Sequence, residues 1–234
     1  MWPKLSSLLS HPAAYHYLRQ ILTGGIPFRR FVRLCGLDDP SQRIADLGCG
    51  PADVLRYVHK DRKAQFYLGV DLSQCYLDAA RGKARRAGMD AEVVALDLER
   101  LPHDAQVREQ LLALLDWHRI TRVLLLGVLH HIDDEAVTTT LDLTHRASTV
   151  QSLVTCDVVR VAGCRLNNFL CDHDCGHHVR DERGYDALAA RSPWKSFTKF
   201  WSSPRFSFIK YIHYEFRKGD VSDVADEQPA EREK

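Results

Sequence analysis

The hydrophobic residues of this chain follow two alternating patterns. Short runs of mostly apolar residues are separated by longer stretches in which apolar residues recur at helical spacing. The short runs predict strands at Arg43–Leu47, Gln65–Val70, Ala91–Leu96, Thr121–Gly127 and Gln151–Val158. Strands that alternate with helices in this way predict an α/β fold with a doubly wound, mostly parallel sheet.

The helices between these strands carry their own start and stop signals. Ser73 is a favourable N-cap for a helix that runs to about Ala87, and Gly88 is a favourable residue to end it. Asp133 is the expected N-cap of a later helix. A helix between these two is predicted from its apolar stripe, which consists of Val107, Leu111 and Leu114.

Two further helices are predicted before the first strand. One begins at Pro12 and ends before Gly24. The next has Gly36 as its C-cap, and its apolar face consists of Phe28, Phe31, Val32 and Cys35. We expect residues 1–40 to form an N-terminal helical cap.

The chain after the fifth predicted strand falls into three parts. We interpret residues 160–193 as an insertion that adds to the cap. Lys195–Trp201 and Phe208–Arg217 are rich in aromatic residues and predict two antiparallel strands, which complete a seven-stranded sheet. Residues 220–234 contain six acids and no aromatic residue, so we expect a disordered acidic tail. Residues 1–219 are therefore predicted to form a single domain.

Composition narrows the class of protein. A chain of 234 residues with 45% hydrophobic residues is long enough for one well-buried domain. The net charge of +1 gives no electrostatic reason to expect a nucleic-acid partner, so a small-molecule substrate is expected, and the oligomeric state stays open. Seven cysteines without regular spacing predict reduced thiols in the cytoplasm. No apolar segment is long enough to predict membrane insertion.

The most informative motif is ADLGCGPAD, at Ala45–Asp53. An apolar run ends at Asp46, and a glycine-rich turn follows. Glycine allows a backbone to turn tightly and to approach a ligand closely, as Gly48 and Gly50 would do here. A strand, turn and helix of this kind predicts a site for a nucleotide-like cofactor.

Polar residues also follow the other predicted strands. The second strand ends at Asp71, the third at Asp97, and the fourth in LGVLHH, which ends with His130 and His131. Ligands in an open parallel sheet bind beyond the carboxyl ends of the strands, so these groups are expected to surround one site. A carboxylate such as that of Asp71 offers two oxygens to the two hydroxyls of a ribose.

With these four motifs in order, the sequence resembles the class I S-adenosylmethionine-dependent methyltransferases from Arg43 to about Val159. The first motif of that family is acid, x, Gly, x, Gly, x, Gly. Here Asp46, Gly48 and Gly50 match, and Ala52 takes the third glycine position. The resemblance implies a Rossmann-like methyltransferase fold with S-adenosyl-L-methionine as cofactor.

The family's motifs also imply a role for each part of the site. The glycine turn would hold the methionine part of the cofactor, Asp71 the ribose, and Asp97 with Leu98 the adenine. Gly127 and the residues after it would line the methionine side. The full set of expected cofactor-binding residues is Asp46, Gly48, Cys49, Gly50, Asp71, Leu72, Asp97, Leu98, Gly127 and Val128.

A nicotinamide-dependent dehydrogenase is the competing interpretation, because its fingerprint is also glycine-rich and is followed by an acid. That fingerprint needs a third glycine three residues after the second, where this chain has Asp53. A dehydrogenase also gives no reason for Asp97 or for LGVLHH. The sequence therefore favours S-adenosylmethionine.

His130 and His131 are the candidate catalytic residues. They follow the fourth strand, near the expected position of the methyl group, and a histidine titrates close to neutral pH. Either could deprotonate a hydroxyl or amine, with His130 preferred because it comes first after the strand. The alternative is that the pair only orients the cofactor or packs beneath it.

The segment CDHDCGHHVRDERGY, at Cys171–Tyr185, allows three interpretations. Its cysteines and histidines could bind zinc, but no second ligand pair is evident elsewhere, and we predict no metal. It also resembles the cap of a subset of small bacterial methyltransferases, whose pattern is matched by Asp174, Gly176, Val179, Arg180, Gly184 and Tyr185. That resemblance implies that Arg180 or Tyr185 faces the substrate. The third interpretation is a surface loop.

The opposite wall of the pocket is expected to come from the N-terminal helices, where Tyr15 is a candidate substrate-binding residue. We therefore expect an enzyme that transfers a methyl group from S-adenosylmethionine to an oxygen or nitrogen nucleophile of a small molecule. The alternative is a methyltransferase-like protein that binds the cofactor or a partner without turnover.

Overall fold

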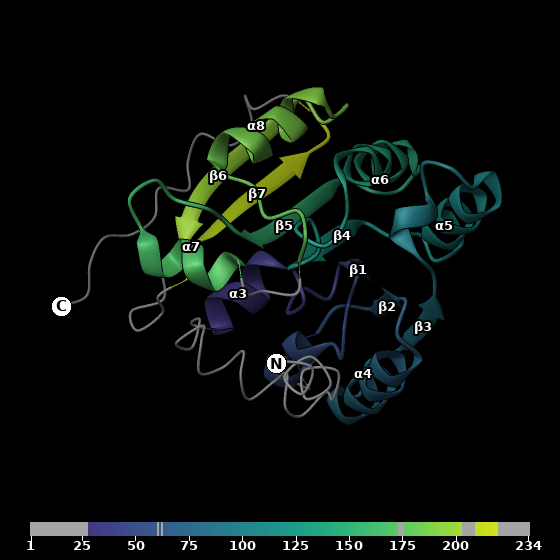
Figure 1. Cartoon of the computed structure of the whole chain (residues 1–234). Helices are drawn as coiled ribbons and strands as arrows, with labels where there is room; N and C mark the ends of the chain where they lie inside the picture. The colour runs from purple at the N-terminus through teal and green to yellow at the C-terminus, as the bar shows by residue number, and fades with distance from the viewer. Residues whose placement is uncertain (1–27, 60, 62, 173–175, 203–208, 220–234) are drawn as a thin grey trace.

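The computed structural model describes residues 28–59, 61, 63–172, 176–202 and 209–219. Its centre is a seven-stranded sheet with the strand order β3-β2-β1-β4-β5-β7-β6 (Figure 1). β7 runs antiparallel to both of its neighbours, and the other paired strands run parallel. This arrangement confirms the predicted Rossmann-like fold class. The strands are β1 (Arg43–Leu47), β2 (Phe66–Asp71), β3 (Ala91–Ala95), β4 (Arg122–Leu126), β5 (Ser152–Val158), β6 (Ser196–Ser202) and β7 (Tyr211–Arg217).

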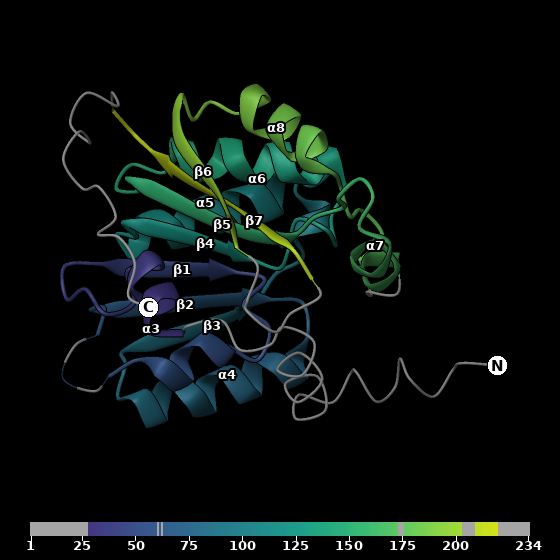
Figure 2. The ribbon, with the colours of Figure 1, turned by 90° about the vertical axis from the view of Figure 1, so that its left-hand side faces the viewer.

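Helices cover both faces of the sheet (Figures 1 and 2). One buried cluster joins the sheet to α5 (Ala105–Trp117), α6 (Asp134–Arg146) and α8 (Glu182–Arg191), and the short 3₁₀ helix η2 (Leu98–Arg100) also contributes to it. The other cluster joins it to α3 (Phe28–Leu34), the 3₁₀ helix η1 (Asp53–Tyr57), α4 (Gln74–Ala87) and α7 (Arg165–Asp172). The sheet is thus the middle layer of three.

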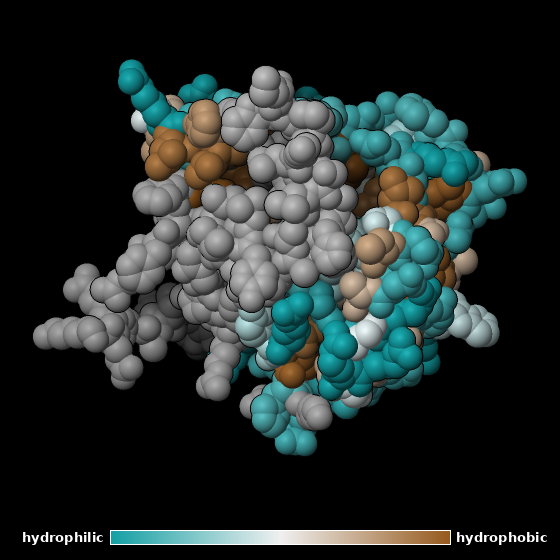
Figure 3. Space-filling view, turned by 60° about the horizontal axis from the view of Figure 1, so that its bottom comes forward, coloured by the Kyte–Doolittle hydropathy of each residue, from teal (hydrophilic) through white to brown (hydrophobic). Residues whose placement is uncertain are grey.

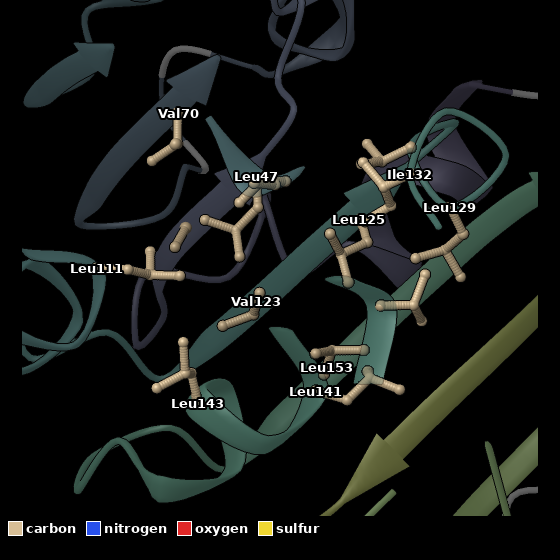
Figure 4. Packing of buried hydrophobic residues seen from close by; sticks show 14 of the residues in the cluster. Leu47, Val70, Leu111, Val123, Leu125, Leu129, Ile132, Leu141, Leu143 and Leu153 are labelled. Atoms are coloured by element: carbon tan, nitrogen blue, oxygen red, sulfur yellow. The ribbon is translucent and has the colours of Figure 1, made fainter. Parts of the chain in front are cut away.

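The alternation of side chains along the strands divides the core between these layers. In β1, Ile44 contributes to the cluster with α3 and α4, whereas Ala45 and Leu47 contribute to the cluster with α5 and α6. Figure 4 shows the second cluster, in which Val123 and Leu153 from neighbouring strands lie beside side chains of the covering helices. Because the central strands β1, β2, β4 and β5 are buried on both faces, their sequences are mostly apolar.

The predicted helix signals have the expected geometry. Ser73 accepts a hydrogen bond from the Tyr76 amide at the start of α4, and Gly88 ends that helix with a left-handed φ of 64°. Asp133 caps α6 through the Ala136 amide. On α5 the prediction needs one correction: Leu115 is fully buried where we expected Leu114, which is only partly buried. The strand at 195–201 begins one residue later, and the strand at 208–217 begins at Tyr211.

The two ends of the chain are only partly described. The helix predicted from Pro12 and the acidic tail at 220–234 lie outside the described residues, and so does Tyr15. The second predicted helix corresponds to α3, whose buried residues Phe31 and Val32 precede Gly36, with φ of 70°. Within 160–193 the chain forms α7 and α8, and Figure 2 shows α7 at the end of the sheet that β5 leads to.

The molecular surface is mixed in character. Figure 3 shows that hydrophobic residues, in brown, reach one face of the molecule in separate groups between hydrophilic ones. Among the described residues, the most exposed large hydrophobic side chains are Trp117 and Leu72. None of the helices in the described ranges is long and apolar enough to span a membrane.

Candidate active site

The turn after β1 is built from left-handed backbone conformations. Gly48 has φ of 73° and Gly50 has φ of 53°, and glycine adopts such values without steric cost. The amides of Gly48 and Cys49 both donate to the carbonyl oxygen of Val70, at 2.7 and 2.9 Å. The turn is therefore tied to the end of the neighbouring strand β2.

The two glycines of this turn face different surroundings. A Cβ atom on Gly48 would lie 2.5 Å from Val128 Cγ2, so the loop after β4 leaves no room for a side chain. A Cβ atom on Gly50 would meet no atom of the described residues within 4 Å. The backbone at Gly50 thus borders space that a ligand could fill, which is what close approach to a cofactor needs.

The third glycine position of the motif is occupied by a strained alanine. Ala52 is buried and has φ of 50° and ψ of 50°, a conformation that costs a non-glycine residue about 1 kcal/mol. The adjoining residues are held by Lys83 of α4, whose side chain is only 6% exposed. Its ammonium group donates to the Pro51 carbonyl oxygen and pairs with the Asp53 carboxylate. Burial lowers the pKa of Lys83.

Asp46 lies beneath the turn, at the end of β1. Its side chain is 2% exposed, and Oδ2 accepts a hydrogen bond of 2.7 Å from the Tyr67 hydroxyl. Burial, followed by the nearby Asp46 charge, raises the pKa of Tyr67, so this hydroxyl stays a donor. Burial likewise raises the pKa of the Cys49 thiol, which donates to the Gly50 carbonyl oxygen. Both predicted residues therefore support the turn.

Asp71 connects the glycine turn to the start of α4. Its Oδ2 accepts a 2.8 Å hydrogen bond from the Gly50 amide, and its Oδ1 accepts one of 2.8 Å from the Ser73 amide. Leu72, the next residue, is 69% exposed. An ionised carboxylate has about four lone-pair sites, so Asp71 retains capacity for ligand hydroxyls.

The residues after β3 divide into one polar and one buried position. Asp97 caps the short helix η2 through the Glu99 amide at 3.0 Å and is partly exposed. The Leu98 side chain lies in the core, so any contact with a cofactor would come from its backbone.

The loop after β4 lies beside the glycine turn. Gly127, with φ of 73°, donates its amide to Cys156 on β5, and Val128 packs against Gly48. His130 is 4% exposed, and its Nδ1 pairs with Asp157 at the end of β5. The structure therefore places His130 beside Gly127, whose contact with the methionine part of a cofactor stays a prediction.

His131 differs from His130 in exposure. The two rings are in contact, with centroids 4.0 Å apart, but His131 is exposed whereas His130 is buried. The segment 176–180 covers His130: the His178 amide donates to the His130 carbonyl oxygen at 2.9 Å. A Cβ atom on Gly176 would overlap the His130 ring and would lie 2.6 Å from its carbonyl oxygen.

Arg180 fixes this covering segment to the loop after β4. Its guanidinium donates to the carbonyl oxygens of Leu129, Ile132 and His178 and forms an ion pair with Asp134. The Tyr185 ring lies 5.8 Å from the guanidinium carbon, and the side chain is 2% exposed. Its hydroxyl donates to Val158 at 2.9 Å. Direct substrate contact by Tyr185 stays a prediction, which this burial disfavours.

The remaining predicted site features lie mostly outside the described residues. Of the possible zinc ligands in the cap segment, His173 and Cys175 are not described, and Cys171 is buried against Val159. Within the described ranges, no cluster of three histidine, cysteine or acidic residues has the geometry of a metal site.

Two supporting residues were missed by the sequence analysis. Asp157 accepts hydrogen bonds from the loop after β4, and Lys83 supports the glycine turn. Asp157 had a readable signal, because it follows the buried run SLVTC in the same way that Asp46 and Asp71 follow theirs. Lys83 had none, since a lysine on a predicted helix is ordinarily solvated.

Comparison with known proteins agrees with this geometry. A family model described as a methyltransferase domain matches residues 44–149. No curated protein sequence matches the chain. Among solved structures, a SAM dependent methyltransferase from Archaeoglobus fulgidus superposes with a TM-score of 0.60 at 16% identity, covering 87% of this chain and 100% of that chain.

Two further solved structures share the fold. The geranyl diphosphate C-methyltransferase from Streptomyces coelicolor has a TM-score of 0.54 at 14% identity, over 81% of this chain and 74% of that chain. The [4+2]-cyclase SpnF has a TM-score of 0.52 at 17% identity, over 81% and 80%. These identities show likeness of fold. Residues 44–149 therefore contain a methyltransferase domain, and the chain has the fold of S-adenosylmethionine-dependent methyltransferases.

Proposed function

We propose that this enzyme transfers the methyl group of S-adenosylmethionine to an oxygen or nitrogen nucleophile of a small molecule. The observation that carries the proposal is the glycine turn itself. Its Gly50 amide is tied to Asp71, and the space beside Gly50 is open. A turn held in this way presents a carboxylate and backbone groups to one ligand at the end of the sheet.

The described residues fit the cofactor of the family. The turn at Gly48 and Gly50 would hold its methionine part, together with Gly127 of the loop after β4. Asp71 would accept hydrogen bonds from the ribose hydroxyls, with Leu72 beside the sugar. Asp97 and the Leu98 backbone would contact the adenine. In this arrangement Asp46, Cys49 and Val128 would support the turn on the side away from the cofactor.

The chemistry that this cofactor supplies when bound is a methyl group activated by a sulfonium charge. The protein's task is then to align the acceptor, exclude water and remove a proton where the acceptor carries one. Alignment alone accounts for roughly 7–11 kcal/mol of barrier reduction in well-oriented systems. Within the described residues, His130 is placed to take the proton, since its ring lies beside Gly127.

Three observations support a small acceptor. The net charge of +1 gives no overall electrostatic attraction to a nucleic acid. The segment 176–180 covers His130 closely, so little of the histidine is exposed. The Streptomyces coelicolor neighbour is a geranyl diphosphate C-methyltransferase, and geranyl diphosphate is a small molecule. We further propose that residues 1–40 and 160–193 together form the cap over the acceptor.

Calorimetric titration with S-adenosylmethionine and, separately, with NAD tests the cofactor. We expect binding of S-adenosylmethionine only, weakened about 10- to 100-fold in Asp71→Ala because hydrogen bonds to a charged group are lost. Asp78→Ala, at an exposed acid on the following helix α4, is the matched control and should bind as the wild type does. Binding of NAD alone would refute the proposal.

Release of S-adenosylhomocysteine across a panel of small hydroxyl and amine compounds tests turnover. The competing function is cofactor or partner binding without methyl transfer. The likeness to the [4+2]-cyclase SpnF is the reason to consider this second function, since that protein shares the fold and its name describes a cyclisation. Cofactor binding with no release over a broad panel would support this second function.

A further inference from the structure

Asp157 is the most enclosed acid in the described part of the molecule. It is 1% exposed and accepts hydrogen bonds from three successive backbone amides of the loop after β4. The donors are Val128 at 3.3 Å, Leu129 at 2.9 Å and His130 at 3.2 Å. Its Oδ1 also pairs with the Nδ1 atom of the His130 ring. One carboxylate therefore holds both the loop backbone and the imidazole.

These contacts determine the tautomer of His130. Three of the four partners are N–H donors, which an ionised carboxylate accepts without needing a proton of its own. The fourth partner, Nδ1, then has to carry a hydrogen to bond the same group. In a neutral imidazole only one nitrogen is protonated, so Nε2 becomes the acceptor.

The surroundings of the ring show where Nε2 lies. Its two neighbouring ring atoms are Cε1 and Cδ2. Cε1 would be 3.8 Å from a Cβ atom on Gly127, whereas Cδ2 abuts Gly176. Nε2 therefore lies between the Gly127 turn, on the methionine side of the cofactor site, and the covering segment 176–180. Nδ1 faces away from this space, toward β5.

We propose that Asp157 is a positioning residue, which fixes His130 in the Nδ1–H tautomer and so makes Nε2 the proton acceptor for a hydroxyl or amine substrate. This proposal rests on the proposed methyl transfer. As the acceptor atom forms its bond to the methyl carbon, the carbon–sulfur electron pair goes to sulfur and the acceptor's proton goes to Nε2. Charge balances, because the sulfonium loses its charge as the imidazole gains one.

Gly176 also helps to fix the position of the His130 ring. Any side chain there would displace the His130 ring, because the added Cβ atom would overlap it. The His178 amide fixes the spacing through the His130 carbonyl oxygen. The covering segment therefore packs against the Cδ2 edge of a ring whose orientation Asp157 sets.

The tautomer can be measured without knowing the substrate. Two-bond ¹H–¹⁵N correlation spectra of the full chain with ¹⁵N-labelled histidine distinguish the two neutral tautomers, and His130→Gln identifies the His130 signal. At mildly alkaline pH we expect the Nδ1–H form in the wild type. Asp157→Asn should change it to the Nε2–H form, since an amide NH₂ group then faces Nδ1. Asp116→Asn, at a partly exposed acid that accepts hydrogen bonds from Ser148, is the matched control and should leave the signal unchanged.

An Nε2–H tautomer in the wild-type protein would overturn the inference, and this readout stands even if Asp157→Asn fails to fold. With an active acceptor from the panel, Asp157→Asn should lose on the order of 10²- to 10⁴-fold in kcat, as for loss of general base catalysis. Its Kd for S-adenosylmethionine should stay within about twofold of the wild type, since Asp157 touches no cofactor-binding residue except through the Val128 amide. Full turnover in Asp157→Asn would overturn the inference and leave the proposed methyl transfer standing, whereas failure of the wild type to bind S-adenosylmethionine would overturn the proposed function.

Discussion

The turn after β1 and the loop after β4 form two sides of one candidate site, but they are held by different means. The turn owes its shape to backbone conformations that glycine favours, and its main partners Val70 and Asp71 come from the next strand in sequence. The loop owes its shape to distant side chains, Asp157 and Arg180, which bind its amides and carbonyl oxygens. We call the turn the cofactor side of the proposed site and the part of the loop around His130 its acceptor side. The first is encoded locally, and the second depends on tertiary contacts.

This difference fits the chemistry of each side. A cofactor common to a family can be held by backbone groups, which any sequence with the right glycines supplies. The acceptor differs between enzymes, and side chains are what can vary. Substitutions on the two sides should therefore separate cofactor affinity from turnover, and the following variants test that separation.

The largest effect is expected where the two sides touch. Gly48→Ala should destabilise the fold by roughly 3–5 kcal/mol, from left-handed strain and overlap with Val128. Gly50→Ala is the matched control: its Cβ atom meets no atom of the described part of the chain within 4 Å, so we expect a loss of only about 1 kcal/mol. Gly50→Ala should instead weaken S-adenosylmethionine binding. Urea unfolding and calorimetry measure both, and equal destabilisation by the two variants would contradict this account.

The next largest effect concerns the acceptor side alone. Arg180→Ala leaves the carbonyl oxygens of Leu129 and Ile132 without their donor and should cost about 3 kcal/mol in the free energy of unfolding. Arg180→Lys should not restore it, because an ammonium group cannot reach the same set of acceptors. The Kd for S-adenosylmethionine should change less than threefold in both.

Arg183, an exposed arginine on α8, provides the control for this variant. Arg183→Ala should change stability by no more than about 0.5 kcal/mol. If Arg180→Ala weakened cofactor binding as strongly as Asp71→Ala does, the two sides of the site would not be independent.

Sensitivity to acid is also expected in the part of the sheet formed by β6 and β7. His213 on β7 is buried against Phe200 and Ser202, and burial lowers its pKa to about 4. Between about pH 6.5 and pH 4 the unfolded chain binds a proton that the folded protein does not, so stability falls as the pH is lowered. This contribution is at most roughly 3 kcal/mol.

His213→Phe removes the titrating group and preserves an aromatic ring against Phe200. The slope of unfolding free energy against pH between 4 and 6.5 should be smaller in this variant than in the wild type, whatever the change in stability at neutral pH. Thermal unfolding at several pH values measures it. An unchanged slope would show that His213 does not carry this dependence.

The smallest effect is expected at Ala52. Ala52→Gly relieves left-handed strain but gives the unfolded chain more freedom, and the two terms nearly cancel. Stability should change by less than about 0.5 kcal/mol, with unchanged cofactor affinity. A loss above 1 kcal/mol in urea unfolding would instead show that the Ala52 methyl group is an important part of the core.

Much of the fold could be predicted from the sequence because its signals are local. β1 has the predicted bounds, and α4 begins and ends at the predicted caps Ser73 and Gly88. Hydrophobic periodicity, helix caps and glycine turns each act over a few residues, so they are readable from the chain alone. The boundaries of β7 and the buried stripe of α5 were less exact, since packing against neighbours decides them.

The candidate site was predictable on one side only. The sequence by itself determined the glycine turn, the acids at strand ends and the position of His130, because each follows directly from a strand terminus. Only the tertiary structure decided that Asp157 holds the loop 28 residues before it, that Lys83 reaches 30 residues back to Asp53, and that Arg180 spans 51 residues to Leu129. Such pairs depend on which strands lie side by side in the sheet, and no local pattern of residues specifies that order.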